Sequence, residues 1–357
     1  MAVSHYESVK RVAILGVTGS IGRQALDVVG ANQELELVAA QSGSTPIDGL
    51  APLTQVGGDP VELLERADAD VVLNAVVGFA GIRATMWALE HGVTLALANK
   101  ESLVAGGELA VAAWRRGGGL LLPVDSEHSA AFQCLEGRSA ESIAGLVLTA
   151  SGGPFRGRTR TELEDVTPKD ALAHPTLNMG PKITIDSATL GNKGLELLEA
   201  HFLFDLPYDR IELVVHPTSI VHALVRFRDG ASLAHLGYPD MRVPISFALT
   251  YPNRAATAIT QLDLASGLTL EFHAPDFETF PLPALAREAG ERGGTFPCAF
   301  NAANEVAVQA FLDGRIAFLD IAAAVEDVLA RVDGAPARDL DELVEADRRA
   351  RELVPVA

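Results

Sequence analysis

Two polar clusters follow two apolar runs between residues 97 and 129. The first consists of Asn99, Lys100 and Glu101, and the second, after Leu120 to Val124, consists of Asp125, Ser126, Glu127 and His128. Ligands of an open parallel sheet lie at the carboxyl ends of its strands, so both clusters should face one crevice. In extended backbone, side chains i and i+2 point the same way, so Asp125 and Glu127 could present two carboxylates to one cation. A polar turn after a buried strand would explain a single acid but explains the whole cluster less well.

The elements that must position these residues begin with a glycine turn near the amino terminus. Arg11 to Val17 is predicted as a buried strand, Gly16, Gly19 and Gly22 follow at three-residue spacing, and Ile21 to Val29 is predicted as a helix. Glycines let the backbone approach a pyrophosphate, and the helix start offers free N–H groups. The pattern favours nucleotide binding over a chance turn.

The end of the next predicted strand, Leu35 to Ala40, bears on the choice of cofactor. NAD enzymes usually carry an Asp or Glu there for the ribose hydroxyls. This chain instead has Gln41, Ser42, Gly43 and Ser44. The missing acid favours NADP, although no Lys or Arg stands there to hold its phosphate.

Alternating strands and helices predict an α/β protein with a doubly wound nucleotide-binding domain. Further strands are expected at Val71 to Val77, Val93 to Leu97 and Leu146 to Thr149, with helices at Val61 to Arg66 and Ile82 to His91. An α+β catalytic domain with a lid loop and a C-terminal helical domain are expected to follow. The predicted boundaries are 1–124 for the nucleotide domain, 125–260 for the catalytic domain with a lid at about 151–181, 261–290 for a linker, and 291–357 for the helical domain.

The stretch after residue 181 predicts a phosphate site. Lys182 to Ile185 is predicted as a strand that leads into a helix. Ser187, Asn192 and Lys193 would combine a hydroxyl, an amide and a cation near the start of that helix. The alternative is a capped helix with solvated charges, and we expect Glu199 to be such a charge.

Weak periodicity over residues 151–181 predicts a lid with two short helices. Thr161 with Glu164 fits a capping box, and Thr167 before Pro168 fits an N-cap. Later, Ile220 to Phe227 and Ala231 to Leu236 flank a hairpin turn whose sheet edge could pair across a dimer axis. Helical periodicity predicts three closing helices at Asn301 to Phe311, Phe318 to Arg331 and Asp339 to Leu353.

Composition restricts the class of protein. At 357 residues with a net charge of -19, the chain should hold more than one domain and should bind neither nucleic acid nor an anionic membrane. No apolar run approaches the roughly 20 residues of a membrane span, and the first residues lack the apolar core of a signal peptide. Cys134 and Cys298 form no close pair. These features favour the cytoplasm.

Eight motifs, in this order along nearly the whole chain, resemble the 1-deoxy-D-xylulose 5-phosphate reductoisomerase family. They are GVTGSIG (16–22), ANKES (98–102), VDSEHS (124–129), SGGPF (151–155), DSATLGNKGLE (186–196), HPTSIVH (216–222), GYPDMRVPI (237–245) and NAANEV (301–306). Several are rare elsewhere, so the resemblance is specific.

The resemblance implies isomerisation of a ketose phosphate followed by its reduction with NADPH, assisted by Mg²⁺ or Mn²⁺, in a homodimer. It implies that Lys100, Glu127 and His174 are catalytic and that the metal ligands are Asp125, Glu127 and Glu196. The implied substrate contacts are Lys100, Ser126, Glu127, Ser151, His174, Ser187, Asn192, Lys193 and Glu196. The implied cofactor contacts are Thr18, Gly19, Ser20, Ile21, Ser42, Asn99, Glu101 and Gly180.

Two departures from the family pattern stand out. Ala40-Gln41-Ser42 replaces the usual Gly-Lys-Asn, which leaves the 2′-phosphate contact open. The lid reads His174-Pro175-Thr176-Leu177, where a tryptophan usually follows the third residue. The alternative functions are a non-catalytic NADP-sensing regulator and a metal-independent phosphosugar dehydrogenase. Neither function requires three acidic side chains at one site.

Overall fold

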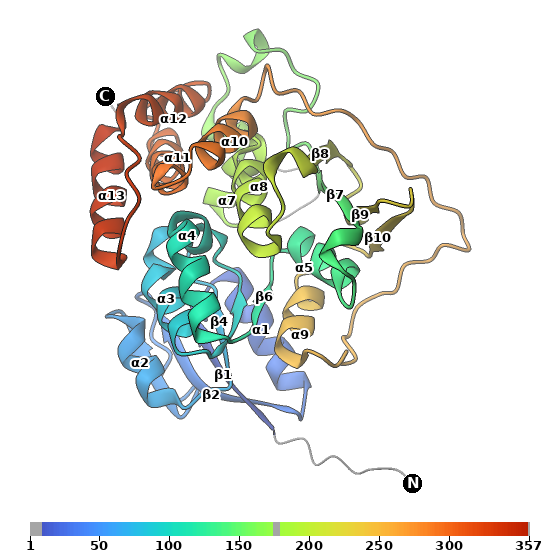
Figure 1. Cartoon of the computed structure of the whole chain (residues 1–357), viewed down its shortest axis with the longest axis vertical. Helices are drawn as coiled ribbons and strands as arrows, with labels where there is room; N and C mark the ends of the chain where they lie inside the picture. The colour runs from blue at the N-terminus through green and yellow to red at the C-terminus, as the bar shows by residue number, and fades with distance from the viewer. Residues whose placement is uncertain (1–8, 174–178, 356–357) are drawn as a thin grey trace. The chain divides into compact units, whose positions relative to one another are not determined.

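The computed structural model describes residues 9–173 and 179–355, and the chain forms two compact units (Figure 1). One contains residues 1–99, 112–129 and 240–260, and the other contains residues 100–111, 130–239 and 261–357. Neither unit is one continuous stretch. Helices α4 (Lys100–Gly117) and α5 (Ser126–Leu135) each contribute residues to both.

The first unit is built on a six-stranded parallel sheet with the order β3-β2-β1-β4-β5-β6. Its strands are β1 (Lys10–Leu15), β2 (Leu35–Ser42), β3 (Leu53–Val56), β4 (Val71–Asn74), β5 (Thr94–Leu97) and β6 (Leu121–Pro123). Its helical elements are α1 (Ser20–Ala31), α2 (Pro60–Ala67), η1 (Gly78–Gly81), α3 (Ile82–Glu90) and α9 (Arg242–Thr250).

Helices cover both faces of this sheet, with α1 and α9 on one side and α2 and α3 on the other (Figure 1). The central strands β1 and β4 are therefore almost wholly buried, which explains their unbroken apolar runs. The predicted doubly wound fold is confirmed. Strand β3 was not predicted, because its residues are only half-buried and show no strong pattern.

The second unit contains a four-stranded sheet with the order β10-β9-β7-β8 and most of the helices. The strands are β7 (Ile143–Ala150), β8 (Ile211–Val215), β9 (Val221–Phe227) and β10 (Ser232–Leu236). The principal helices are α6 (Pro168–Ala171), α7 (Pro181–Ala188), α8 (Gly191–Phe204), α10 (Leu282–Arg292), α11 (Phe296–Leu312), α12 (Asp320–Arg331) and α13 (Leu340–Leu353), with short 3-10 turns at η2 (Ala140–Ser142), η3 (Thr161–Leu163) and η4 (Tyr208–Arg210). The predicted β9–β10 hairpin and the three closing helices are confirmed.

Two local predictions are wrong. Lys182 to Ile185 is not a strand but part of helix α7, which starts with Pro181 in its first turn and packs against α8 and α11. The predicted capping box at Thr161 and Glu164 is replaced by one turn of 3-10 helix, where the Glu162 carboxylate accepts from Thr159. Helix α10 lies in the predicted linker. The cap at Thr167 is confirmed, with Asp170 completing a capping box.

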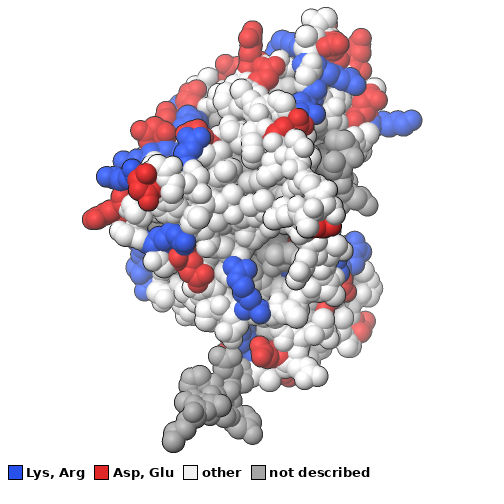
Figure 2. All heavy atoms as spheres, turned by 90° about the vertical axis from the view of Figure 1, so that its right-hand side faces the viewer, with Lys and Arg blue, Asp and Glu red and all other residues white. Residues whose placement is uncertain are grey.

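The edge strand β10 and the extended segment 251–281 expose apolar side chains. These include Leu233, Leu236, Tyr238, Leu264, Leu268 and Phe272, of which Leu264 is 61% exposed. The segment's one bridge pairs His273 with Val215. Figure 2 shows few charged side chains across the middle of the face on which these parts lie. Among the described residues, no helix is long and apolar enough to cross a membrane.

Candidate active site

The glycine turn between β1 and α1 has the geometry that a dinucleotide requires. Gly16 has a φ of 74°, and a Cβ there would lie 2.5 Å from the Ala75 carbonyl oxygen. A Cβ on Gly22 would lie 2.3 Å from the Gly16 carbonyl oxygen. Only glycine fits either position. Gly19 is the N-cap of α1, makes no side-chain cap, and is exposed together with Ser20, so the helix start is open to an anion.

Gln41, at the end of β2, holds this turn through two hydrogen bonds. Its side-chain Oε1 accepts a hydrogen bond from Gly16 N at 3.2 Å, and its carbonyl accepts one from Val17 N at 2.9 Å. The neighbouring Ser42 is fully buried and donates its hydroxyl to the Thr45 carbonyl at 2.5 Å. The end of β2 is therefore a packed structural site in this chain.

Asn99 follows β5 and is also buried. Its amide donates to the Gly78 carbonyl at 2.8 Å, which holds η1 against the end of the sheet. A Cβ on Gly81 would lie 2.4 Å from the Asn99 Oδ1, so the glycine allows this close packing. Asn99 thus fixes the position of η1 beside the end of β5.

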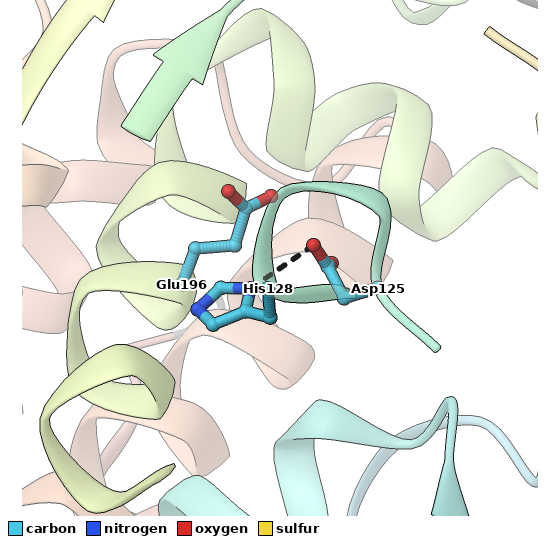
Figure 3. A group of neighbouring side chains, drawn as sticks. All are labelled: Asp125, His128 and Glu196. Atoms are coloured by element: carbon cyan, nitrogen blue, oxygen red, sulfur yellow. Dashed lines mark hydrogen bonds and ion pairs between the residues drawn. The ribbon is translucent and has the colours of Figure 1, made fainter. Parts of the chain in front are cut away.

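The Asp125 cluster does not have the predicted extended backbone, because α5 begins at Ser126. Asp125 Oδ1 accepts a hydrogen bond from Glu127 N at 3.2 Å, the bond that an N-cap side chain makes. His128 is fully buried, and its Nδ1 lies 3.0 Å from the same oxygen (Figure 3). The Glu127 Oε2 accepts from the Ser126 hydroxyl at 2.6 Å.

His128 is a residue whose role the sequence did not reveal. With its Nδ1 as the donor, it fixes the orientation of the Asp125 carboxylate, as ring N–H groups do behind ligand carboxylates. The spacing of three residues on a helix start could have revealed this contact. The oxygen donors of Asp125 and Glu127 fit a hard divalent cation better than zinc.

In the second unit, the Glu196 side chain on α8 (Figure 3) is fully buried and contacts three polar side chains. Its Oε1 lies 3.2 Å from Lys100 Nζ and its Oε2 lies 2.5 Å from Lys193 Nζ. Asn192 donates to Glu196 and accepts from Lys100 at 3.0 Å. Lys100, Asn192 and Lys193, three of the predicted substrate contacts, therefore lie around one carboxylate.

Ser151 and Ser187 come from two segments that a glycine lets approach each other. A Cβ on Gly153 would lie 2.6 Å from the Ser187 carbonyl oxygen, so only glycine allows the loop after β7 to reach the end of α7. Ser151 Oγ accepts from Gly153 N at 3.3 Å, and both serines are half-buried. The two hydroxyls remain candidates for a phosphate.

A second buried network joins the start of α4 to the start of α7. Lys182 Nζ lies 2.9 Å from Glu101 Oε1 and 2.8 Å from Asp186 Oδ2, and Asn304 donates to Asp186 at 2.8 Å. Burial alone would raise the pKa of Glu101, but the Lys182 ammonium lowers it below its ordinary value. Burial raises the pKa of Asp186 despite the same partner. None of these contacts was predicted.

The remaining predicted residues lie outside these two networks. His174 and Leu177 lie outside the described residues. Gly180 is the exposed N-cap of α7. Glu199, expected to be solvated, is completely buried on α8, so that prediction is wrong. Helix α8 packs against α7, α10 and α11 as well as β7 and β8, and this leaves it little solvent-facing surface.

Known proteins resemble the chain over most of its length. Residues 12–57 and 54–107 match the family described as 1-deoxy-D-xylulose 5-phosphate reductoisomerase, residues 121–204 match its C-terminal domain, and residues 236–353 match the DXP reductoisomerase C-terminal domain. The 1-deoxy-D-xylulose 5-phosphate reductoisomerase of Rhodococcus jostii is 50% identical, with 96% of this chain and 94% of that protein covered. The Chloroherpeton thalassium protein of the same description is 44% identical, with 97% of each covered.

Solved structures also resemble this chain over nearly its whole length. The Zymomonas mobilis 1-deoxy-D-xylulose 5-phosphate reductoisomerase in complex with NADPH has a TM-score of 0.89 at 40% identity and covers 97% of this chain and 98% of that one. A DOX-P reductoisomerase in complex with NADPH, fosmidomycin and magnesium has a TM-score of 0.89 at 35% identity and covers 97% of both chains.

Proposed function

Because this chain belongs to the 1-deoxy-D-xylulose 5-phosphate reductoisomerase family, we propose that it converts 1-deoxy-D-xylulose 5-phosphate to 2-C-methyl-D-erythritol 4-phosphate. The conversion is an isomerisation followed by a reduction, it uses NADPH and a divalent metal, and it belongs to the non-mevalonate isoprenoid precursor pathway. The observation that carries the proposal is the buried Glu196 carboxylate beside Lys100, Lys193 and Asn192. Buried charges with several polar partners in one cluster are typical of functional sites.

We propose that Asp125, Glu127 and Glu196 hold Mg²⁺ or Mn²⁺. Their oxygen donors suit hard cations. The metal, when bound, would supply a Lewis acid for the substrate's carbonyl oxygen, and NADPH would supply the reducing hydride. His128 keeps the Asp125 carboxylate in position. Glu196 can serve as a ligand once Lys100 and Lys193 turn toward the substrate, for which their long side chains are suited.

NADPH would bind at the turn formed by Thr18, Gly19, Ser20 and Ile21. The pyrophosphate would lie at the start of α1, where backbone N–H groups and the helix dipole favour an anion. The remaining proposed contacts are Ser42, Asn99, Glu101 and Gly180. Of these, Asn99 and Glu101 flank the catalytic Lys100, so the nicotinamide end would lie beside that lysine.

The substrate phosphate would be held by Ser151, Ser187, Asn192 and Lys193. Lys193 would make a charge-assisted contact, and the serine hydroxyls would donate hydrogen bonds. Lys100 and Ser126 would hold the reacting end, where Glu127 could accept and return a proton. His174 would close over the substrate from the lid.

We further propose that the protein is a cytoplasmic homodimer in which the β10 edges pair. Exposed Leu233, Leu236 and Tyr238 on or just after this edge, together with the exposed apolar residues of segment 251–281, support that interface. As functional regions distinct from the two compact units, we propose residues 1–124 for NADPH binding, residues 125–260 for catalysis, metal and substrate with a lid at about 151–181, a linker at 261–290, and a helical region at 291–357.

Oxidation of NADPH in the presence of 1-deoxy-D-xylulose 5-phosphate, with and without a chelator, tests the function. We expect oxidation that stops when the chelator is added and resumes with Mg²⁺ or Mn²⁺. NADPH oxidation that continues at the same rate after the chelator is added would indicate a metal-independent dehydrogenase. NADPH binding without any oxidation would indicate a non-catalytic sensor.

A further inference from the structure

We propose that Lys182 is a positioning residue that holds Glu101 in place for NADPH and joins it to the turn at Gly180. This inference rests on the proposed function, because it takes Glu101 and Gly180 as cofactor contacts. Lys182 itself is not expected to touch the cofactor or the substrate.

The contacts of Lys182 place it between two carboxylates. Its Nζ lies 2.9 Å from Glu101 and 2.8 Å from Asp186, and its side chain is only 19% exposed. The Asp186 side chain is 1% exposed and is fixed by Asn304 of α11. One end of the ion-pair chain is therefore anchored in the helical core, and the other end is Glu101 in the first turn of α4.

The same lysine stands in the turn that carries Gly180. Thr184 donates to the Gly180 carbonyl through both its N–H, at 3.1 Å, and its hydroxyl, at 2.8 Å. These bonds make Gly180 part of the first turn of α7, in which Lys182 also lies. The Lys182–Glu101 pair consequently links two segments that are far apart in sequence and that both supply a proposed cofactor contact.

The charges explain why one cation is needed here. Without Lys182, the Glu101 and Asp186 carboxylates would be buried without their shared cation, which is costly. Burial alone would lower the pKa of Lys182, but Asp186 and Glu101 raise it, so the ammonium stays charged at neutral pH. Glu101 would then keep its orientation before NADPH arrives, and less ordering would be needed on binding.

The chain offers a matched control. Arg351 of α13 also stands between two carboxylates, with Asp347 at 2.6 Å and Glu305 at 2.7 Å. These pairs include neither Glu101 nor any other proposed site residue, although the Glu305 carboxylate also contributes to raising the pKa of Lys182. Arg351→Met should therefore lower thermal stability as Lys182→Met does, without affecting the cofactor.

The test measures NADPH affinity by nucleotide fluorescence on the full chain without substrate, beside the KM for NADPH and kcat. We expect Lys182→Met to weaken NADPH binding by about tenfold, a typical coupling within one ion-pair network, and Lys182→Arg to restore most of it. In a Glu101→Gln background, Lys182→Met should add little, because its effect passes through Glu101. Arg351→Met should bind NADPH like the wild type.

Three results would overturn the inference: wild-type NADPH affinity in folded Lys182→Met, an equal loss of affinity in Arg351→Met, or a full additional loss in the Glu101→Gln background. If Lys182→Met does not fold, the NADPH affinities of Lys182→Arg and Glu101→Gln test the inference instead. A wild-type affinity in Glu101→Gln would refute the role of the fixed carboxylate. An inactive wild type that binds NADPH would contradict the proposed function alone, because the affinity comparison needs no turnover.

Discussion

Replacing Gln41 by leucine and by lysine separates two ways in which this position can affect NADPH. Its Oε1 accepts the Gly16 N–H in the cofactor turn, and its side chain is buried. Leucine fills a similar volume but accepts nothing. Lysine also accepts nothing, yet it adds a cation beside Ser42, a proposed cofactor contact, where it could reach the 2′-phosphate of NADPH.

The magnitudes follow from the hydrogen bond and the charge. A buried donor left without its acceptor costs about 1 to 3 kcal/mol, and because Gly16 is only half-buried we expect the lower half of that range. Both variants should thus bind NADH about five- to thirtyfold more weakly. A charge-assisted contact to the 2′-phosphate is worth about 1.5 to 3 kcal/mol, so the lysine should recover NADPH binding to near the wild-type level.

The assay is a set of four fluorescence titrations, each variant with NADH and with NADPH. We expect the leucine variant to lose affinity for both nucleotides equally and the lysine variant to raise the preference for NADPH by about tenfold or more. Unchanged NADH affinity in Gln41→Leu would refute the supporting role of the hydrogen bond. An unchanged nucleotide preference in Gln41→Lys would show that the 2′-phosphate is held elsewhere.

Three further predictions concern the site and the interface. Glu196→Gln should abolish turnover while leaving NADPH affinity nearly unchanged in the same fluorescence titration, and near-normal turnover at saturating Mn²⁺ would exclude Glu196 as a ligand. Lys193→Ala should raise the substrate KM, since a charge-assisted phosphate contact is worth about 1.5 to 3 kcal/mol, and a wild-type KM in steady-state kinetics would show that this lysine does not bind the phosphate. Leu233→Lys should convert the proposed dimer to a monomer in sedimentation equilibrium, and a dimer that persists would place the interface away from β10.

Local sequence patterns were sufficient to predict the glycine turn between β1 and α1. Gly16, Gly19 and Gly22 are required by local geometry, and the strand before them has an unbroken apolar run because helices cover both faces of the sheet. The strand predicted at Lys182 to Ile185 failed for a different reason. Its two isoleucines and a threonine favour extended backbone, but Pro181 at the helix start and packing against α8 and α11 outweigh that weak preference.

The second polar cluster has a different backbone geometry from the one predicted. Asp125 and Glu127 were paired through the two-residue period of a strand, whereas the backbone turns into α5 at Ser126. An Asp followed by Ser and Glu is also a helix-start pattern, and the bond from Glu127 N to Asp125 is its signature. A helix start at this position also predicts that His128 lies beside Asp125, because residues three apart are neighbours on a helix.

The contacts of Lys182 could not be read from the sequence, because Glu101, Lys182 and Asn304 are separated by long stretches and only the packing of α4, α7 and α11 joins them. The same holds for α8, whose apolar spacing predicted one buried face and one solvated face. Its neighbours instead bury both Glu196 and Glu199. Well-packed apolar residues can often replace buried ion pairs at no loss of stability. A helix that keeps Glu196 under Lys100 and Lys193 is therefore explained better by the chemistry of a site than by the needs of the fold.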